Sequence, residues 1–388
     1  MPKSNGQRHV LIFEPRVEGH HIPYLVNIAN ELLSLGNTVS IAIDNRTEEA
    51  KKRILQQDST LLAKVAILDL FTQEGRFKGG SKLAAGAICL NETQADEIFF
   101  NSLDEVASSM FRRAVIGIFP PKSLFKKVSG IYVRPRPPDP SQNGIGNWIK
   151  RVGFRKLYNK GFFRSLFLQD EFLVPIVEAQ YPNLSVAFLP ERHTPLPTLS
   201  TEEARAKLGF NTERIVLLSY GIGSRRKGLH LVLEALEHFP EHPFFLLVAG
   251  VQEDKATVGR LKQLQAAGKA LVLDRYVSSE EEAALFAATD IVLLPYVCHY
   301  GSSNVLTKAA FAGKPVLASD FHLIGKRVQT HGLGWVFKHE DVIDLHKRMQ
   351  ALAGDSKDAI KPFRQALNDY AKRCDRTAFS KAIQALFS

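Results

Sequence analysis

Residues 215–236 read IVLLSYGIGSRRKGLHLVLEAL, and this stretch indicates the fold class of the chain. It begins inside the mainly apolar run 214–220, which predicts a buried strand, and the segment 229–238 has the apolar spacing of a helix. Two glycines, Gly221 and Gly223, stand between them, where the chain must turn. A strand, a glycine turn and a helix in this order form one βα unit.

The same alternation continues on both sides of this unit. Toward the C-terminus, apolar runs predict strands at 244–250, 270–273, 291–295 and 316–319, with helices at 255–267, 279–289 and 304–312. Toward the N-terminus they predict strands at 9–13, 38–43, 65–70, 97–100, 114–119, 130–133 and 165–169, with a helix at 22–35. Because strands that alternate with helices form parallel sheets, each half is expected to be a doubly wound α/β domain.

The two halves meet at the proline-rich stretch LPERHTPLPTLS, residues 189–200, which is the best linker candidate. A chain of 388 residues also exceeds the roughly 250 to 300 at which a single core stops growing. We therefore expect an N-terminal domain over 1–192 and a C-terminal domain over 193–360. The remaining residues, 361–388, are expected to form a terminal helix that packs back on the N-terminal domain.

Composition narrows the function classes. The formal charge of +10 favours anionic partners, but no single-strand-binding pattern, helix-turn-helix or finger motif accompanies it, so nucleic acid is not an expected partner. Three scattered cysteines indicate a reducing compartment and argue against a structural zinc. No apolar stretch approaches the roughly 20 residues needed to cross a bilayer, so a cytoplasmic location is expected.

The turn SYGIGSRRKG, residues 219–228, predicts a phosphate site. Gly221 and Gly223 let the backbone approach a ligand, the following helix start adds partial positive charge, and Arg225, Arg226 and Lys227 add full charges. The alternative is an ordinary strand-to-helix turn with solvated basic side chains.

A second polar turn, within HYGSSNVLTKAAFAGKPVLA at 299–318, follows the predicted strand 291–295. Gly301, Ser302 and Ser303 lead into a helix at Asn304, so their hydroxyls and amides can cap that helix or hold a phosphate. Both roles are open, and the phosphate turn upstream favours binding.

Residues 214–338 resemble the donor-binding domain of glycosyltransferase family 4, a retaining family of GT-B architecture. The matching pieces are GIGSRRKGLHLVLEAL, VLDRYVSSEEEAALFAATDIVLLPY and KAAFAGKPVLASD. The resemblance implies two Rossmann-like domains facing a cleft, and a hexosyltransferase-type enzyme of class EC 2.4. It implies that Lys227 holds the donor diphosphate, that the 302–306 turn presents amides to it, and that the base lies near 276–278.

The donor-binding residues expected from the motifs and the resemblance are Gly19, Gly221, Gly223, Arg225, Arg226, Lys227, Tyr276, Val277, Tyr300, Gly301, Ser302, Ser303, Asn304, Val305 and Lys308. Two departures stand out. The family's pair of glutamates falls on Tyr300 and Lys308, and its usual arginine after the first glycine is Ile222. We hypothesise that Arg225 or Arg226 replaces that arginine. A non-catalytic GT-B binding or partner subunit is the alternative function. The residues that an epimerase or a phosphorylase would need are not found in this sequence.

The N-terminal loop EPRVEGHHIPY, residues 14–24, leaves the first predicted strand through a glycine and two histidines. Similar GT-B enzymes place a glycine-bearing loop here, close to the donor phosphate and acceptor hydroxyl. Gly19, His20 and His21 are therefore candidates, the histidines as catalytic residues beside Lys227, although helix capping or plain exposure explains a histidine equally well. Asn101, Arg134 and Asp170 each follow a predicted strand and are the acceptor-site candidates.

Transfer with retention requires a neutralised diphosphate and an acceptor held on the same sugar face, so electrostatic stabilisation carries the reaction. No aspartate pair for a metal is evident, and we expect neither metal nor cofactor beyond the nucleotide-sugar donor. The acceptor is a glycan, a lipid-linked sugar or a small molecule. The basic, Phe-containing segment 151–167 suggests either peripheral contact with an anionic membrane at its inner face or a buried amphipathic helix.

Overall fold

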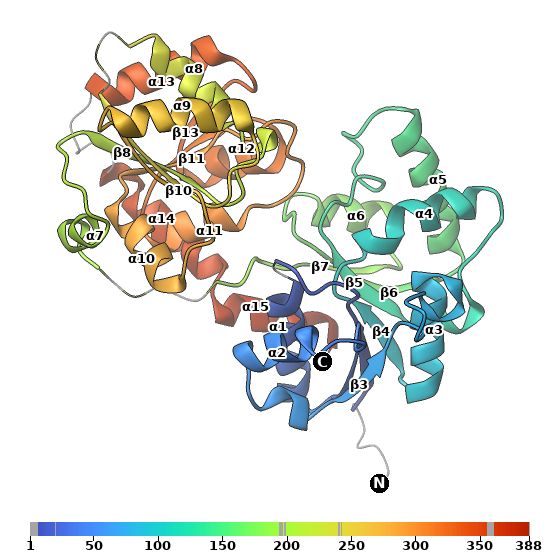
Figure 1. Ribbon diagram of the computed structural model, residues 1–388. Coiled ribbons are helices and arrows are strands. Elements are labelled where there is room, and N and C mark those ends of the chain that lie inside the picture. The colour runs from blue at the N-terminus through green and yellow to red at the C-terminus, as the bar shows by residue number, and fades with distance from the viewer. Residues whose placement is uncertain are drawn as a thin grey trace. The chain divides into compact units, whose positions relative to one another are not determined.

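A computed structural model describes residues 7–19, 21–193, 197, 199–239, 241, 243–354 and 361–387 (Figure 1). The chain forms two compact units. Unit 1 comprises Met1–Pro190 and Phe379–Ser388, and unit 2 comprises Glu191–Ala378. Each unit is one parallel sheet with helices on both faces, which confirms the expected pair of doubly wound α/β domains.

Unit 1 contains a seven-stranded sheet in the order β3-β2-β1-β4-β5-β6-β7. Its strands are β1 (His9–Phe13), β2 (Thr38–Ile43), β3 (Ala66–Asp69), β4 (Glu97–Phe100), β5 (Val128–Tyr132), β6 (Phe163–Leu168) and β7 (Ser185–Phe188). Every pair is parallel, and Phe13 at the end of β1 lies opposite both Ala42 and Phe100. The residues that follow β1 and β4 are therefore neighbours at one edge of the sheet.

Two layers of helices cover the unit 1 sheet. The helices are α1 (His21–Ser34), α2 (Glu49–Gln57), α3 (Lys82–Thr93), α4 (Asp104–Val115), α5 (Ile145–Asn159), α6 (Val174–Gln180) and α15 (Arg376–Phe387). One apolar core joins α3, α4, α5 and α6 to one face of the sheet, and a second joins α1, α2 and the end of α15 to the other. In the second core Phe387 packs against Phe99 and Phe167, with ring centroids 5.9 and 6.3 Å apart.

Unit 2 contains a six-stranded parallel sheet in the order β10-β9-β8-β11-β12-β13. Its strands are β8 (Ile215–Tyr220), β9 (Phe244–Ala249), β10 (Ala270–Leu273), β11 (Ile291–Leu294), β12 (Val316–Ser319) and β13 (Gly334–Phe337). Its helices are α7 (Thr201–Lys207), α8 (Leu229–Glu237), α9 (Lys255–Ala266), α10 (Ser279–Ala288), α11 (Asn304–Phe311), α12 (His322–His331), α13 (Val342–Gly354) and α14 (Arg364–Arg373). Helices α8, α9 and α13 share one core, and α7, α10, α11, α12 and α14 share the other (Figure 1).

Two expectations from the sequence need correction. The run 114–119 is not a strand, because Ala114 and Val115 form the last turn of α4 and Gly117 turns the chain with φ of 84°. The tail 361–388, expected to contain a terminal helix that packs back on the N-terminal domain, contains two helices, α14 and α15. Helix α14 packs through Leu367 and Tyr370 into unit 2, and only the part from Phe379 onward belongs to unit 1.

The segment 151–167 is also not a single amphipathic helix. It includes most of α5, a turn and most of β6, and its phenylalanines Phe154, Phe162, Phe163 and Phe167 are buried. These rings belong to the cores of unit 1, so they are not offered to a membrane.

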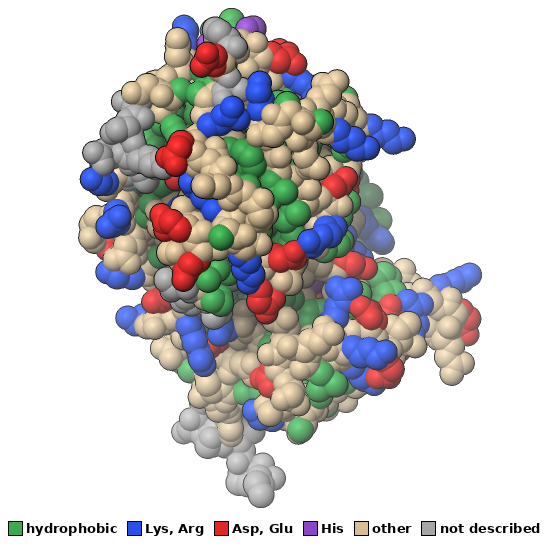
Figure 2. Space-filling model, turned by 60° about the vertical axis from the view of Figure 1, so that its left-hand side comes forward, with side chains coloured by type: hydrophobic (Ala, Val, Ile, Leu, Met, Phe, Trp, Pro, Cys, Tyr) green, Lys and Arg blue, Asp and Glu red, His purple; other side chains and the backbone are tan. Residues whose placement is uncertain are grey.

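Positively and negatively charged side chains are mixed on the surface of the protein. On the face drawn in Figure 2, Lys and Arg side chains alternate with Asp and Glu instead of forming one continuous basic stripe. In the described part of the chain, every helix is too short or too polar to span a bilayer.

Candidate functional site

Each sheet has a topological switch point, where the strand order changes direction. It lies between β1 and β4 in unit 1 and between β8 and β11 in unit 2. In open α/β sheets, ligands bind outside the carboxyl ends of the strands at this point. The side chains that follow these four strands are therefore the first place to look for a site.

In unit 2 the switch point holds Lys227. Its Nζ donates to the hydroxyl of Tyr296, two residues past β11, at 2.7 Å, and lies 3.5 Å from the carbonyl oxygen of Tyr220 at the end of β8. The ammonium also lies 4.4 Å from the centre of the Tyr296 ring. Among the described residues Lys227 forms no ion pair, so its positive charge faces only neutral partners. A half-buried cation without a carboxylate is suited to binding an anion.

Glycines allow the backbone to bring Lys227 to this place. Gly221 follows β8 with φ of 97°, a conformation that favours glycine, and a Cβ there would lie 3.6 Å from the Lys227 Nζ. Gly228 ends the short 3-10 turn Arg225–Lys227 with φ of 73°, and a Cβ there would lie 1.7 Å from the Pro295 carbonyl oxygen. Gly223 continues the turn, with its amide donating to the Val251 carbonyl at 2.8 Å.

Beside Lys227 lies the beginning of α11. Ser303 occupies the N-cap position, but its hydroxyl makes no capping bond and lies 3.2 Å from the Tyr296 hydroxyl. The Ser302 hydroxyl accepts from the guanidinium of Arg327. Because both serines are directed to other partners, the amides of Asn304 and Val305 have no acceptor among the described residues. Uncapped amides at a helix start bind anions.

The two arginines of the turn point to different partners. Arg226 donates to Nδ1 of His299, and Nε2 of His299 in turn donates to the Ser302 carbonyl at 2.9 Å. Arg225 instead lies near Asp254 and His230. A hydrogen bond from Thr257 lowers the pKa of Asp254 most, and the charge of Arg225 lowers it further. Burial lowers the pKa of His230 most, and Arg225 again adds to the shift. Arg226 therefore belongs to the turn around Ser302, and Arg225 faces the beginning of α9.

Residues 276–278, expected near the nucleotide base, precede α10. Tyr276 is 77% exposed, and Val277 packs against the core that contains α10 and α11. Ser278 is the N-cap of α10 and shares a capping box with Glu281. The loop is thus fixed by a well-capped helix and presents an exposed aromatic ring.

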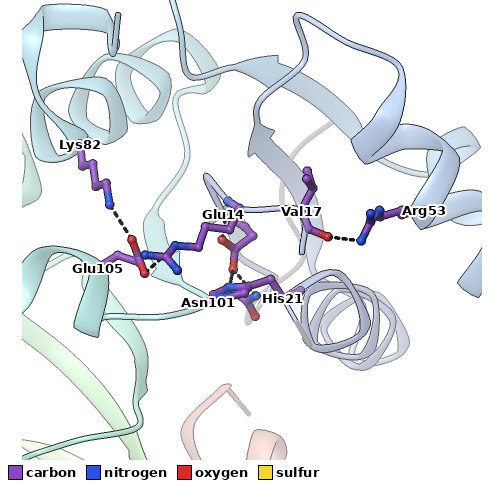
Figure 3. A network of polar contacts seen from close by, with 8 residues as sticks. Glu14, Val17, His21, Arg53, Lys82, Asn101 and Glu105 are labelled. Carbon is purple, nitrogen blue, oxygen red and sulfur yellow. Dashed lines mark hydrogen bonds and ion pairs between the residues drawn. The ribbon is translucent and has the colours of Figure 1, made fainter. Parts of the chain in front are cut away.

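Unit 1 carries a second polar centre at its own switch point (Figure 3). Glu14 follows β1 and is fully buried. One carboxylate oxygen lies 2.8 Å from Nδ1 of His21 and accepts from Nδ2 of Asn101 at 2.6 Å, and the other accepts the Arg16 amide at 2.8 Å. Asn101 also donates to the His21 carbonyl at 2.9 Å. His21 and Asn101, predicted separately, therefore meet on a carboxylate that the sequence did not single out.

Side chains from three other elements hold the 14–19 loop in place (Figure 3). Arg16 pairs with Glu105 at 2.9 Å, and Lys82 pairs with the same carboxylate at 2.5 Å. Burial alone would raise the pKa of Glu105, but these two cations lower it below its usual value. Arg53 donates to the Val17 carbonyl at 3.0 Å. The loop is thus anchored on both sides of the switch point.

The remaining unit 1 candidates have structural roles or lie apart. Asp170 accepts from the amides of Phe172 and Leu173 and orders the turn before α6. Arg134 has an exposed side chain, and its amide donates to Asp104 at 3.1 Å. Gly19 adopts φ of 60° with nothing within 4 Å of an added Cβ, so its conformation alone favours glycine. His20 lies outside the described residues.

Residues 200–373 match the family model described as Glycosyl transferases group 1. The match spans most of unit 2, including the Lys227 turn, the loop at 276–278 and the beginning of α11. Comparison with curated proteins gives no match.

Solved structures show the fold of the whole chain. HepE of Anabaena, in complex with UDP and glucose, is 15% identical with a TM-score of 0.68, covering 97% of this chain and 98% of its own. WaaG, a glycosyltransferase involved in lipopolysaccharide biosynthesis, is 15% identical with a TM-score of 0.63 and the same coverage. A mutant of TarM from S. aureus, in complex with Fondaparinux, alpha-GlcNAc-glycerol and UDP, is 9% identical with a TM-score of 0.66, covering 98% and 100%. The fold is that of GT-B glycosyltransferases.

The two positions at which the resemblance expects glutamates, Tyr300 and Lys308, have defined partners in the structure. Lys308 pairs with Glu282 of α10 at 2.5 Å, and Glu282 also accepts the hydroxyl of Tyr220 at the end of β8. Burial and this carboxylate raise the pKa of Tyr220. Tyr300 is buried against His322. A carboxylate is therefore present beside Lys308, but it comes from a different helix.

Sequence reasoning also missed the group that fixes Ser302. Arg327 of α12 is buried and faces Glu191, a carboxylate at the beginning of unit 2. Burial raises the pKa of Glu191, while Arg327 and hydrogen bonds from Ser302 and Thr307 oppose that shift. No local pattern signals this pair, because its members lie far apart in the sequence.

Among the described residues, one group of possible metal ligands is found, and it lies in unit 2. Cys298, His339 and Glu340 place their ligand atoms within 4.8 Å of one another. Nε2 of His339 accepts the Cys298 amide at 3.1 Å, a hydrogen bond that metal binding through this atom would break. Metal independence of the reaction stays a prediction.

Proposed function

We propose that this protein transfers a sugar from a nucleoside diphosphate sugar to a hydroxyl acceptor, and that unit 2 binds the diphosphate. The observation that carries the proposal is the surroundings of Lys227. Its ammonium has only neutral partners, and it lies beside a helix start whose two serines are directed away. The positive field for the two phosphates comes from Lys227, from Arg226 and from the amides of Asn304 and Val305.

The proposal also assigns the nucleotide base and the ribose of the donor to residues of unit 2. We infer that the nucleotide base lies near Tyr276 and Val277. Glu282, held by Lys308 and Tyr220, supplies the carboxylate that the family motif carries elsewhere, and it is suited to accept from ribose hydroxyls. UDP is found with HepE and TarM, and UDP is accordingly the first nucleotide to test here.

The chemistry follows from these charges. As the bond between the anomeric carbon and the phosphate oxygen breaks, negative charge grows on the leaving diphosphate, and Lys227 and Arg226 stabilise it. The new bond forms to the acceptor oxygen, whose proton leaves with the departing phosphate or an adjacent base. Retention of configuration, hexosyl specificity and independence from metal are parts of this proposal that come from the family resemblance.

We infer that the acceptor binds in unit 1, as a glycan, a lipid-linked sugar or a small molecule. Peripheral contact with an anionic membrane has one supporting feature: Ile145 and Trp148 at the beginning of α5 are 80% and 61% exposed. Lys150 follows these two residues. Burial lowers the pKa of Lys150 most, and repulsion from Arg112 and Arg136 lowers it further. Sedimentation with anionic and neutral vesicles tests this contact, and a Trp148→Ala variant that sediments like the wild type would exclude this surface.

A thermal-shift screen tests the main proposal. The protein is heated with UDP, GDP, ADP, TDP and their common sugar conjugates, in the wild-type form and as Lys227→Ala. A ligand at 100 times its dissociation constant stabilises by about 2.7 kcal/mol, which such a screen detects readily. We expect a base-selective shift that the variant loses, and release of the nucleoside diphosphate from the sugar conjugate.

The outcomes separate the alternatives. A shift without any turnover indicates the non-catalytic binding subunit. A shift that survives in Lys227→Ala shows that the nucleotide binds elsewhere. The matched control is Lys262→Ala, which removes an exposed lysine of α9 from the same unit and should leave every shift unchanged.

A further inference from the structure

Three side chains of unit 2 with metal-binding atoms gather where neighbouring strands end. Cys298 follows β11, and His339 and Glu340 follow β13. Strand β12 lies between these two strands and is parallel to both, so the loops after all three share one edge of the sheet. One sulfur, one nitrogen and one oxygen of the three side chains lie within 4.8 Å of one another. The sheet thus brings together residues that are 41 positions apart in the sequence.

The imidazole of His339 is held in place between the other two side chains. Its ring stacks on Phe321, with centroids 4.3 Å apart and 28° between the planes. The His339 amide donates at 2.8 Å to Asp320, the residue that follows β12. Nε2 of the ring accepts the Cys298 amide at 3.1 Å, and Nδ1 lies 3.4 Å from a carboxylate oxygen of Glu340. The ring therefore has one nitrogen toward each of its two neighbours in the group.

Cys298 and Glu340 share a backbone conformation that is costly for their residue types. Their φ values are 48° and 58°, in the left-handed region that residues other than glycine rarely adopt. Among the described residues only five that are not glycine have a positive φ, and two of these belong to this group. Such conformations cluster at functional sites. Both side chains are exposed, so an ion from solution can reach them.

The chemistry of the three ligand atoms selects the ion. A thiolate, an imidazole nitrogen and a carboxylate oxygen suit Zn²⁺, whereas Mg²⁺ and Ca²⁺ take oxygen ligands. In the described part of the chain Glu340 forms an ion pair only with His339, so no Lys or Arg there competes for its carboxylate. We propose that Cys298, His339 and Glu340 form a binding site for Zn²⁺ or a similar thiophilic divalent cation, with water as the fourth ligand. This site goes beyond the proposed function and does not depend on it.

Binding of the ion changes the contact between Cys298 and His339. An ion on Nε2 displaces the Cys298 amide, and an ion on Nδ1 requires the ring proton on Nε2, where it faces the same amide hydrogen. On either nitrogen this hydrogen bond is lost, and the Cys298 thiol releases its proton to solvent as it becomes the thiolate ligand. The residues on both sides of Cys298 hold Arg226: the Val297 amide donates to its carbonyl at 2.9 Å, and His299 accepts from its guanidinium. The ion would therefore bind to the segment that positions Arg226.

Titration of the chelator-treated full chain with Zn²⁺ tests the site. We expect one ion per chain, an affinity that rises with pH because the thiol must lose its proton, and no comparable binding of Mg²⁺. Co²⁺ used in place of Zn²⁺ should give the intense thiolate-to-cobalt absorption that requires a bond between cobalt and sulfur. Failure of Zn²⁺ to bind, or a Co²⁺ complex without this absorption, would overturn the proposal.

Substitutions identify the ligands. Cys298→Ser, His339→Gln and Glu340→Gln should each weaken Zn²⁺ binding by at least about tenfold, because even loss of a partner outside the ligand shell has an effect of this size. Since Cys298 and Glu340 are exposed, their variants keep the fold even if His339→Gln loses stability with its ring stack. The matched control is Glu253→Gln, which removes an exposed carboxylate from the same unit and should leave the affinity unchanged. Equal Zn²⁺ affinity in wild type and Cys298→Ser would place the ion elsewhere and defeat the inference.

Alkylation of the thiol gives an independent measurement. Cys89 and Cys374 are buried, so iodoacetamide should modify Cys298 first. We expect Zn²⁺ to slow this modification in the wild type and to slow it less in Glu340→Gln. Equal rates with and without Zn²⁺ would show that the sulfur is not a ligand. These measurements use no nucleotide, so a failure of the proposed transferase function would leave their outcome unchanged.

Discussion

The two neighbouring arginines of the unit 2 turn offer a sharp test of the donor site. Arg225→Ala and Arg226→Ala each remove one positive charge from the same 3-10 turn, so they change the net charge equally. Arg226 contacts His299, which holds the Ser302 carbonyl, whereas Arg225 faces Asp254 and His230. We therefore expect only Arg226→Ala to weaken nucleoside diphosphate binding strongly.

The size of the effect follows from the kind of contact. A charge-assisted hydrogen bond to phosphate contributes about 1.5 to 3 kcal/mol, and Arg226 must give up part of its contact with His299, so the lower value applies. That corresponds to roughly a tenfold rise in the dissociation constant. Arg225 faces Asp254 and His230, so we expect it to act on the phosphates only through water. In water a pair of unit charges about 10 Å apart interacts by about 0.4 kcal/mol, which corresponds to roughly twofold in the dissociation constant.

Isothermal titration of the nucleotide against both variants measures this difference. Thermal shift gives an independent value, because a tenfold weaker ligand at 100 times the wild-type constant stabilises by about 1.4 instead of about 2.7 kcal/mol. Equal losses in the two variants would refute the assignment of Arg226 and show that the turn acts through net charge alone. No loss in either would show that the phosphates lie elsewhere.

Three further predictions concern unit 2. Gly228→Ala, with φ of 73° and a Cβ 1.7 Å from the Pro295 carbonyl, should lower the free energy of unfolding by more than about 2 kcal/mol in a urea titration. Burial, and then the charge of Lys308, lower the pKa of His193 in the folded protein to about 4. Because the unfolded ring already binds a proton near pH 6.5, the free energy of unfolding should fall as the pH drops from about 6.5 toward 4. His193→Gln should make this fall smaller. Lys308→Met should cost more stability alone than in combination with Glu282→Gln, because the single variant leaves a carboxylate without its cation, and a double-mutant cycle in urea measures the difference.

Much of the fold was predictable because buried parallel strands leave a simple pattern. Strands such as Thr38–Ile43 and Ala270–Leu273 are short, mainly apolar runs between polar turns, and the expected and observed bounds agree. The run 114–119 has the same composition but a different structure. Its first residues end α4, while Ile116 and Ile118 are exposed. A six-residue apolar run has no period that distinguishes these cases.

The candidate sites were predictable only where the chemistry is local. The glycine turn brings Lys227 into position within a few residues, so its sequence alone indicates the site. Glu14 and Asn101 are 87 residues apart and meet through strand order, which a single sequence does not display. The same applies to Arg226 with His299 and to Lys308 with Glu282, whose partners come from separate elements.

The division of unit 1 into two chain segments has a consequence for biosynthesis. Phe379, Ile383 and Phe387 fill one of its two cores, beside Phe99 and Phe167 of the central strands. A ribosome makes all of unit 2 before it makes these residues. The first 190 residues must therefore wait with an incomplete apolar face through the synthesis of nearly as many more, while unit 2 has every residue it needs as soon as Ala378 has emerged.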